Sequence, residues 1–269
     1  MKTFLLNKLP SCLSLICVFM LVITNAHAID AQQKGYEIAK KSDRSDRGFA
    51  SSQVKLNMVL RNASGNESAR TLEIWTFEMP DESVGDKSLI IFSKPADVNG
   101  TALLSHAKIL EPDNQWLYLP ALKRTKRISS KNKSGPFVGS EFSFEDITGQ
   151  ELNKYQYKWL KAEPCGESTC DVIERYPLYK NSGYTKQIGW VSQANSQPIK
   201  IEYYDRKGQL LKTQKLSNYK LYNNKFWRAL LITMTNEQTH KSTDLIFSDF
   251  TFDVGLNEGD FVKGTLKRL

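Results

Sequence analysis

Histidine is scarce in this chain, with three among 269 residues. His106 and His240 lie far apart, and no histidine and carboxylate spacing matches a metal-binding pattern, so we predict no zinc site. The sequence also has no glycine-rich phosphate loop, dinucleotide fingerprint or nucleophile elbow. Gly139-Ser140 is followed by Glu141 and lacks the second glycine of that elbow. These absences argue against an enzyme and predict neither a cofactor nor a metal.

Long apolar runs are absent beyond the first 28 residues. There, two lysines precede an apolar run over 13–23, and Ala26-His27-Ala28 has the small residues that signal peptidase recognises. The run contains serines and is shorter than the ~20 residues that a membrane-spanning helix needs. We expect residues 1–28 to be a signal peptide cleaved between Ala28 and Ile29. The remaining residues 29–269 would then form one domain in the periplasm.

Cysteine is sparse as well, and two of the four, Cys12 and Cys17, fall inside the predicted signal peptide. Neither is placed to become a lipid-modified N-terminus. The other two, Cys165 and Cys170, would enter an oxidising compartment, where neighbouring cysteines usually pair. Their spacing is wider than that of a redox motif, so we predict a structural disulfide at the tip of a hairpin.

Alternation of apolar and polar residues is abundant. Val54, Leu56 and Met58 alternate with polar neighbours, which is the period of a strand with one buried face. One short helix is expected from Asp30 to Lys41. Further strands are expected over residues 72–79, 89–92, 102–110, 115–119, 154–159, 171–176, 188–191, 199–204, 210–222, 226–235 and 243–250.

The strand pattern predicts a mainly β fold. About ten or eleven strands with few helices fit a sandwich, a closed barrel or one strongly curved sheet. Several strands are apolar on both faces: Trp75 and Phe77 oppose Leu72 and Ile74. One face must therefore cover something other than solvent, and a curved sheet around a helix or a lipid-filled hollow meets that demand.

The most unusual segment runs from Trp116 to Asp146. An aromatic strand ends at Pro120, and a basic run follows before a glycine-spaced aromatic and acidic stretch. The basic residues are Lys123, Arg124, Lys126, Arg127, Lys131 and Lys133. One interpretation makes this run a solvated edge strand whose charges prevent aggregation. The other gives the arginines phosphate or carboxylate groups to bind, on a lipid or an acidic partner protein. Nucleic acid is not expected, because an exported protein has no routine access to it.

Three pieces of the sequence resemble the LolA-like family of outer-membrane lipoprotein-sorting proteins, in particular the branch often found with efflux-type membrane transporters. They are Lys94-Pro-Ala-Asp-Val-Asn-Gly-Thr-Ala-Leu-Leu104, Trp116 to Ile128, and Phe137-Val-Gly-Ser-Glu-Phe-Ser-Phe-Glu-Asp146. A weaker likeness covers residues 250–269, and the resemblance spans roughly Gln53 to Leu269. The long basic run and the predicted disulfide depart from the best-known carriers, so the cargo is left open.

The resemblance implies a half-open, strongly curved antiparallel sheet with short helices on its concave side and an apolar cavity that shields acyl chains. It implies a periplasmic carrier or chaperone for lipidated proteins or amphiphilic lipids, in lipoprotein sorting or lipid transport. An inner-membrane transporter is a candidate partner. The family has no catalytic residues to carry over, and no stable membrane insertion is expected. Two alternatives share the fold: a lipid-sensing regulator, and a ligand-free accessory subunit of an efflux-type transporter.

Candidate binding residues come from the same segment. Arg124 and Arg127 are candidates for contact with a head group or a partner. An ordinary core position is the competing interpretation for each aromatic residue, because alternation lets at most half of them face a cavity. The candidates for the cavity or its rim are Trp116, Tyr118, Leu119, Phe137, Phe142 and Phe144.

Overall fold

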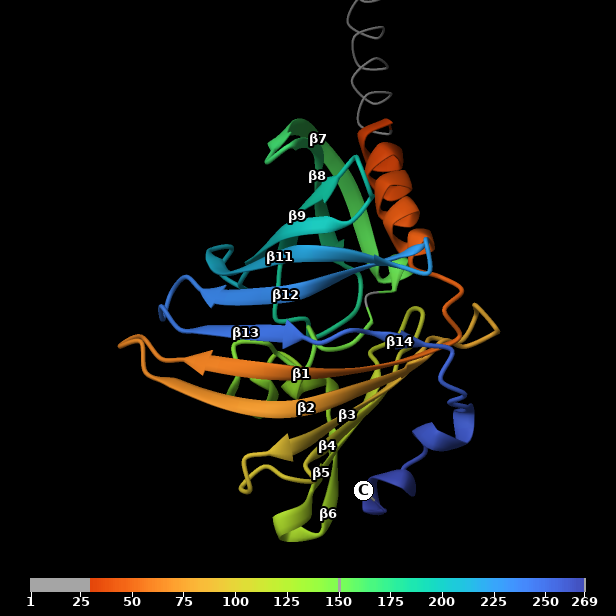
Figure 1. Ribbon diagram of the computed structural model, residues 1–269. Coiled ribbons are helices and arrows are strands. Elements are labelled where there is room, and N and C mark those ends of the chain that lie inside the picture. The colour runs from red at the N-terminus through yellow and green to blue at the C-terminus, as the bar shows by residue number, and fades with distance from the viewer. Residues whose placement is uncertain (1–29, 150, 269) are drawn as a thin grey trace, which may run out of the picture.

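The computed structural model describes residues 30–149 and 151–268, so the predicted signal peptide and its cleavage site lie outside the described residues. Within these residues, the strands form a single antiparallel sheet that is strongly curved (Figure 1). The strands are β1 (Ser51–Arg61), β2 (Glu67–Phe77), β3 (Lys87–Lys94), β4 (Ala102–His106), β5 (Asn114–Leu119), β6 (Arg124–Ile128), β7 (Tyr155–Cys165), β8 (Ser168–Pro177), β9 (Lys186–Ser192), β10 (Pro198–Tyr204), β11 (Leu210–Tyr222), β12 (Phe226–Asn236), β13 (Ser242–Phe247) and β14 (Thr251–Phe252).

The sheet consists of two meanders that meet in the middle. Strands β1 to β6 follow one another from the centre to one edge, and β13 back to β7 follow from the centre to the other edge. The pairing of β1 with β13 joins the meanders, and the short β14 also pairs with β1. The edges of the sheet are therefore β6 and β7, although these two strands are neighbours in the sequence.

Alternation along the strands creates the concave face. Leu56 of β1 lies opposite Leu72 of β2, which lies opposite Phe92 of β3, and all three are buried. On the other side of the junction, Leu245 of β13 lies opposite Met58 of β1. Burying such side chains contributes about 1.5–3 kcal/mol each. The concave face is thus a continuous apolar surface that crosses both meanders.

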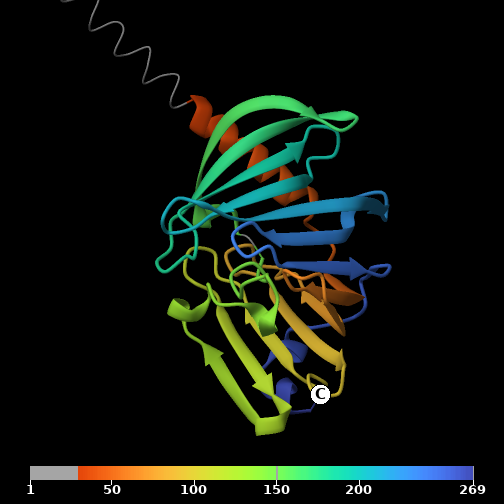
Figure 2. The ribbon, with the colours of Figure 1, turned by 90° about the vertical axis from the view of Figure 1, so that its left-hand side faces the viewer.

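Residues 129–149, called the plug below, cover part of this face on the way from β6 to β7. Figure 2 shows the segment inside the curve of the sheet. Phe137, Phe142 and Phe144 of the plug are buried, and the rings of Phe137 and Phe92 have centroids 5.7 Å apart. The chain here has only short 3-10 turns, namely η2 (Ser130–Asn132), η3 (Phe137–Gly139) and the following η4 (Leu152–Lys154). Another, η1 (Pro120–Leu122), joins β5 to β6.

A helix over residues 30–45 covers the concave face beside β7 to β9 (Figure 1). It extends beyond Lys41, where the sequence predicted its end. Ile38 packs on the apolar side chains of these strands. Gly35 allows close approach, because an ideal Cβ at this position would lie 2.7 Å from the backbone nitrogen of Trp159.

The C-terminal segment covers part of the convex face. The turns η5 (Glu258–Phe261) and η6 (Thr265–Lys267) place Phe261 and Leu266 against Leu89 and Leu104, and all four are completely buried. Phe77 stacks on Phe261 with ring centroids 5.9 Å apart. The region from β2 to β5 is thus covered on both faces, as its two apolar faces predicted.

The predicted class, a mainly β, strongly curved antiparallel sheet, is confirmed. The described residues form fourteen strands, more than the sequence predicted. Two strands lie outside every range expected from the sequence: β6, whose charged residues masked its strand pattern, and β14, which is too short to show alternation. Short helices were expected on the concave side. Instead, one helix over residues 30–45 covers part of this face and the plug covers another part. None of the helices in the described part of the chain is long and apolar enough to cross a membrane.

Candidate functional site

A cavity of about 180 Å³ lies between the N-terminal helix and the concave face of β7 to β10. Its walls are mostly apolar, with a few polar groups at the helix and on β8. The lining residues are Ala39, Ser42, Asp43, Leu152, Tyr157, Ile173, Arg175, Gly189, Val191, Pro198 and Ile201. An apolar cavity of about 150 Å³ is large enough for a benzene molecule. The space under the helix is therefore adequate for one short stretch of hydrocarbon chain.

The floor of the cavity is open because a glycine occupies its centre. Strand register places Gly189 of β9 between Ile173 of β8 and Ile201 of β10. Among the described residues, and apart from its two chain neighbours, an ideal Cβ at Gly189 would have Ile173 Cγ1, at 3.9 Å, as its only neighbour within 4 Å. A larger side chain at this position would therefore extend into the cavity rather than clash with the fold.

The polar groups of the cavity lie at two places. On β8, the Arg175 Nε donates a hydrogen bond to Gln187 Oε1 over 2.7 Å. On the helix, burial raises the pKa of Asp43, although nearby Arg47 lowers it. Burial likewise raises the pKa of Tyr157, whose hydroxyl donates to the Leu152 carbonyl oxygen over 3.1 Å. The cavity thus combines apolar walls with one arginine and one carboxyl group.

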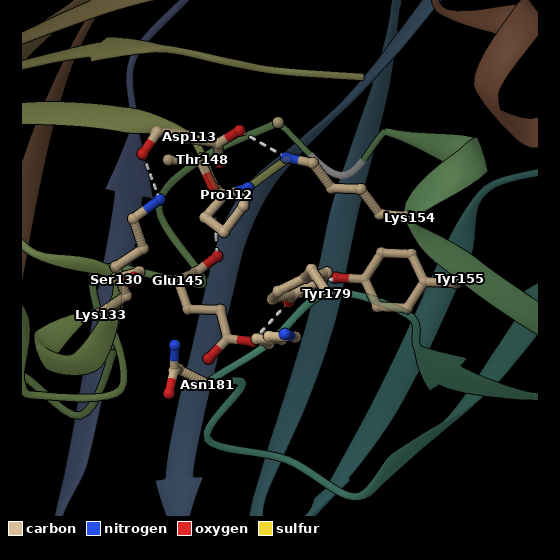
Figure 3. Close-up of a pocket in the computed structure, with 12 residues that line it drawn as sticks. Pro112, Asp113, Ser130, Lys133, Glu145, Thr148, Lys154, Tyr155, Tyr179 and Asn181 are labelled. Atoms are coloured by element: carbon tan, nitrogen blue, oxygen red, sulfur yellow. Dashed lines mark hydrogen bonds and ion pairs between the residues drawn. The ribbon is translucent and has the colours of Figure 1, made fainter. Parts of the chain in front are cut away.

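A buried polar network fixes the plug to the sheet on one side (Figure 3). Lys133 of the plug donates to the backbone oxygen of Asp113, whose carboxylate forms an ion pair with Lys154. Glu145 of the plug accepts a hydrogen bond from the Tyr179 hydroxyl. Burial lowers the pKa of Lys133 to about 8, although the charge of Asp113 raises it. The space among these groups is about 20 Å³, which is enough for a water molecule but not for an organic ligand.

An ion pair holds the other side of the plug. Lys212 Nζ of β11 lies 2.5 Å from Asp146 Oδ2, and both side chains are at least 95% buried. The Asp146 carboxylate also accepts hydrogen bonds from the Tyr184 hydroxyl over 2.7 Å and from the Ser143 backbone N–H over 2.6 Å. The plug therefore contacts the concave face through polar groups as well as through its phenylalanines.

The structure divides the predicted cavity residues between the two faces. Phe137, Phe142 and Phe144 come together on the concave side, where they are packed in the main core. Trp116 and Tyr118 lie on the convex side of β5 and pack beneath the C-terminal segment.

None of these aromatic residues lines the cavity under the helix. The half-buried Leu119 falls on the same side of β5 as Leu117, which contacts the main core.

Part of the basic run, strand β6, forms an exposed edge of the sheet, whereas Lys133 of the same run is buried in the plug. Arg124 and Arg127 are exposed residues of β6, and Arg127 Nη2 donates to Asn114 Oδ1 over 2.7 Å. At the turn before β6, the Leu122 side chain is 64% exposed. The structure therefore shows a solvated edge strand for the β6 part of the run, and its two arginines are accessible to a binding partner.

The predicted disulfide is present, with Cys165 and Cys170 bonded at the tip of the β7–β8 hairpin. No group of histidine, cysteine and carboxylate side chains within residues 30–149 and 151–268 is arranged to hold a metal ion.

Sequence reasoning missed the cavity residues Arg175 and Gly189 and the close contact at Gly35. A glycine inside a strand pattern, as at Gly189, was the available signal, because it often marks a place where another group approaches the backbone.

Comparisons with solved structures cover most of the chain. A domain assigned to outer-membrane lipoprotein sorting in Vibrio parahaemolyticus is 50% identical with a TM-score of 0.85, and the match covers 88% of this chain and 100% of that one. A DUF1329 family protein from Desulfovibrio piger is 27% identical with a TM-score of 0.83, covering 88% and 99%. A LolA superfamily protein from Nitrosomonas europaea is 22% identical with a TM-score of 0.69, covering 85% and 97%, and shares the fold.

A family model described as "uncharacterized protein" matches residues 85–268. No curated protein matches the chain. The Vibrio domain is matched over its full length at 50% identity. The chain therefore belongs to the LolA-like family of outer-membrane lipoprotein-sorting proteins.

Proposed function

We propose that this protein is a periplasmic carrier that shields acyl chains of lipidated proteins or other amphiphiles. The observation that supports it most directly is the apolar cavity between the N-terminal helix and the concave face. The cavity lies between a single helix and the sheet, so an outward shift of that helix would admit an acyl chain. We further propose that residues 1–28 direct export and are removed, which an intact mass beginning at Ile29 would test.

The size of the cavity sets the strength of binding. By comparison with the cavity of about 150 Å³ that holds the six carbons of benzene, a volume of about 180 Å³ holds roughly six methylene groups. Each buried methylene contributes about 0.8 kcal/mol, so the chain segment gains roughly 5 kcal/mol before the costs of association. Binding of a single chain is therefore weak enough for release to a membrane that offers equal burial.

A larger lipid anchor needs more apolar surface than this cavity offers. The plug covers such a surface, because Phe137, Phe142 and Phe144 occupy the concave face beside the cavity. We propose that the plug moves aside for bulky cargo and that these phenylalanines then contact its chains. The polar contacts at Asp146 and Lys212 hold the plug in place until that occurs.

A cavity-filling substitution tests the carrier function. Gly189→Leu places a side chain in the cavity without a backbone clash, so it should abolish binding of the fluorescent fatty acid cis-parinaric acid while the thermal melt stays at or above that of the wild type. Gly189→Ala should have an intermediate effect. Gly264→Leu is the matched control, since that position has ordinary backbone angles and space around it. Equal binding by wild-type protein and Gly189→Leu would contradict the proposed site.

We propose a second step in which the exposed arginines of β6 contact anionic head groups at the membrane or an acidic partner protein. Replacing Arg124 and Arg127 by Ala should reduce co-sedimentation with phosphatidylglycerol vesicles and leave the melting temperature unchanged, since exposed charges contribute little stability. Replacing Arg206 and Lys207, which are exposed in the β10–β11 turn, is the control. Equal losses in both double variants would show a general charge effect and no dedicated surface.

Two alternatives to the carrier function share this fold: a lipid-sensing regulator and a ligand-free accessory subunit of an efflux-type transporter. Native mass spectrometry of protein purified from the periplasm separates the second, because a co-purified lipid excludes a ligand-free role. A regulator would retain its lipid when mixed with acceptor vesicles, whereas a carrier would lose it.

A further inference from the structure

One basic side chain borders the cavity under the helix. Arg175 lies on β8 opposite Tyr157 of β7 and Gln187 of β9. Its guanidinium carbon is 4.9 Å from the centre of the Tyr155 ring, and its Nε donates to Gln187. These contacts hold the guanidinium plane in one orientation at the wall of the cavity.

The guanidinium has a donor that the protein does not use. Arg175 Nη2 is buried and has no hydrogen-bond partner among the described residues. No carboxylate in the described residues forms an ion pair with Arg175. A buried donor without an acceptor is unfavourable, and a charged one more so. The arrangement is therefore better suited to a bound anion than to an apolar ligand alone.

The carboxyl group of the cavity does not act as the anion that pairs with Arg175. Asp43 lines the same cavity from the helix, but its charge interacts with Arg47 and Arg44 rather than with Arg175. Both of those arginines belong to the helix and its continuation. The guanidinium of Arg175 is thus the cation on the sheet side of the cavity, next to the apolar floor at Gly189.

We infer that the Arg175 guanidinium binds the anionic head of a single-chain amphiphile whose hydrocarbon chain occupies the cavity. This inference rests on the proposed carrier function and specifies its ligand class. A carboxylate and a phosphate both offer acceptor oxygens that match the planar fork of arginine. A fatty acid and a lysophospholipid-like phosphate are the two sources of this chemistry.

Competition for one uncharged probe tests the inference. The full mature protein is loaded with N-phenyl-1-naphthylamine, and displacement is followed with dodecanoate, dodecyl phosphate, dodecanol and dodecyltrimethylammonium. The wild-type protein should bind both anions more tightly than the alcohol, with the cation weakest. The tighter of the two anions identifies the source of the head group.

The variants separate charge from packing. Arg175→Met should weaken both anions by roughly ten- to hundredfold, the range expected for a charged hydrogen bond, and retain the affinity for dodecanol. Arg175→Lys keeps the charge and should recover part of the preference for the anions over the alcohol. If the Met variant does not fold, the Lys variant still tests whether the geometry of the guanidinium matters. Arg206→Met, at an exposed position, is the control.

Each result decides between the two proposals. Equal binding of anions and alcohol by the wild-type protein overturns the role of Arg175 and leaves the carrier function standing. Equal losses for all ligands in Arg175→Met also overturn it, since they indicate a structural role. Displacement of the probe by no ligand, or no binding of the probe, contradicts the carrier function itself.

Discussion

Neutralising Asp146 should destabilise the protein more than any single change at its surface. The Asp146 and Lys212 side chains are 3% and 5% exposed, so Asp146→Asn leaves the ammonium of Lys212 buried without its counter-ion. Removing one partner of a buried ion pair typically costs about 3–5 kcal/mol. That is a large share of the roughly 5–15 kcal/mol by which domains are stable. The loss should appear as a lower urea midpoint with an unchanged slope, followed by tryptophan fluorescence.

A matched exposed pair and a double variant complete the test. Asp249 pairs with Lys220, and their side chains are 70% and 47% exposed, so Asp249→Asn should leave the midpoint unchanged. Adding Lys212→Met to Asp146→Asn removes the unpaired charge and should restore part of the lost stability. If Asp146→Asn and Asp249→Asn shift the midpoint equally, Lys212 is not desolvated and the plug is not held by this pair.

Gly35→Ala should displace the N-terminal helix, because its Cβ would lie 2.7 Å from strand backbone. Proteolysis within the helix should be faster than in the control variant Gly149→Ala, where an added Cβ meets no atom of the described residues within 4 Å apart from its chain neighbours. Replacing Cys165 and Cys170 by Ser should cost about 2 kcal/mol and keep the fold, and the unreduced, unfolded wild-type protein should show no free thiol. Because the folded-state pKa of Lys133 is about 8 and lies below its unfolded value, the unfolded chain binds more protons above that pH. Stability should therefore rise between pH 8 and 9.5, and Lys133→Met should remove this rise in urea titrations.

The sequence predicted the strands well wherever one face was apolar. The alternation at Leu56 and Met58 gave β1, and the two apolar faces at Trp75 and Ile74 predicted that β2 is covered on both sides. The basic run gave no alternation, so β6 was foreseen only as one interpretation of its charges. The alternation of apolar and polar residues along a strand indicates which face is buried, but it does not indicate which segment covers that face.

The cavity could not be located from the sequence for the same reason. Pairings between separate strands bring together Ile173, Gly189 and Ile201. The helix that covers these residues precedes all of these strands in the chain. The aromatic residues of the plug were the conspicuous signal, yet Phe137 and Phe142 have the ordinary role of filling the core. Large aromatic residues bury area wherever they lie, so their abundance alone does not distinguish a binding wall from packing.

The two-meander topology determines the order in which this protein can fold. Each strand pairing except those of β1 with β13 and β14 joins consecutive strands and forms from local chain segments. The β1–β13 pairing brings Arg61 to Asp244 across 183 residues, so the entropy of closing a long loop opposes it. The N-terminal helix belongs to the first half of the chain but packs on the second. The cavity is therefore complete only after the helix docks on β7 to β9, which is a second non-local step, and the return of probe binding during refolding should lag behind the return of β structure.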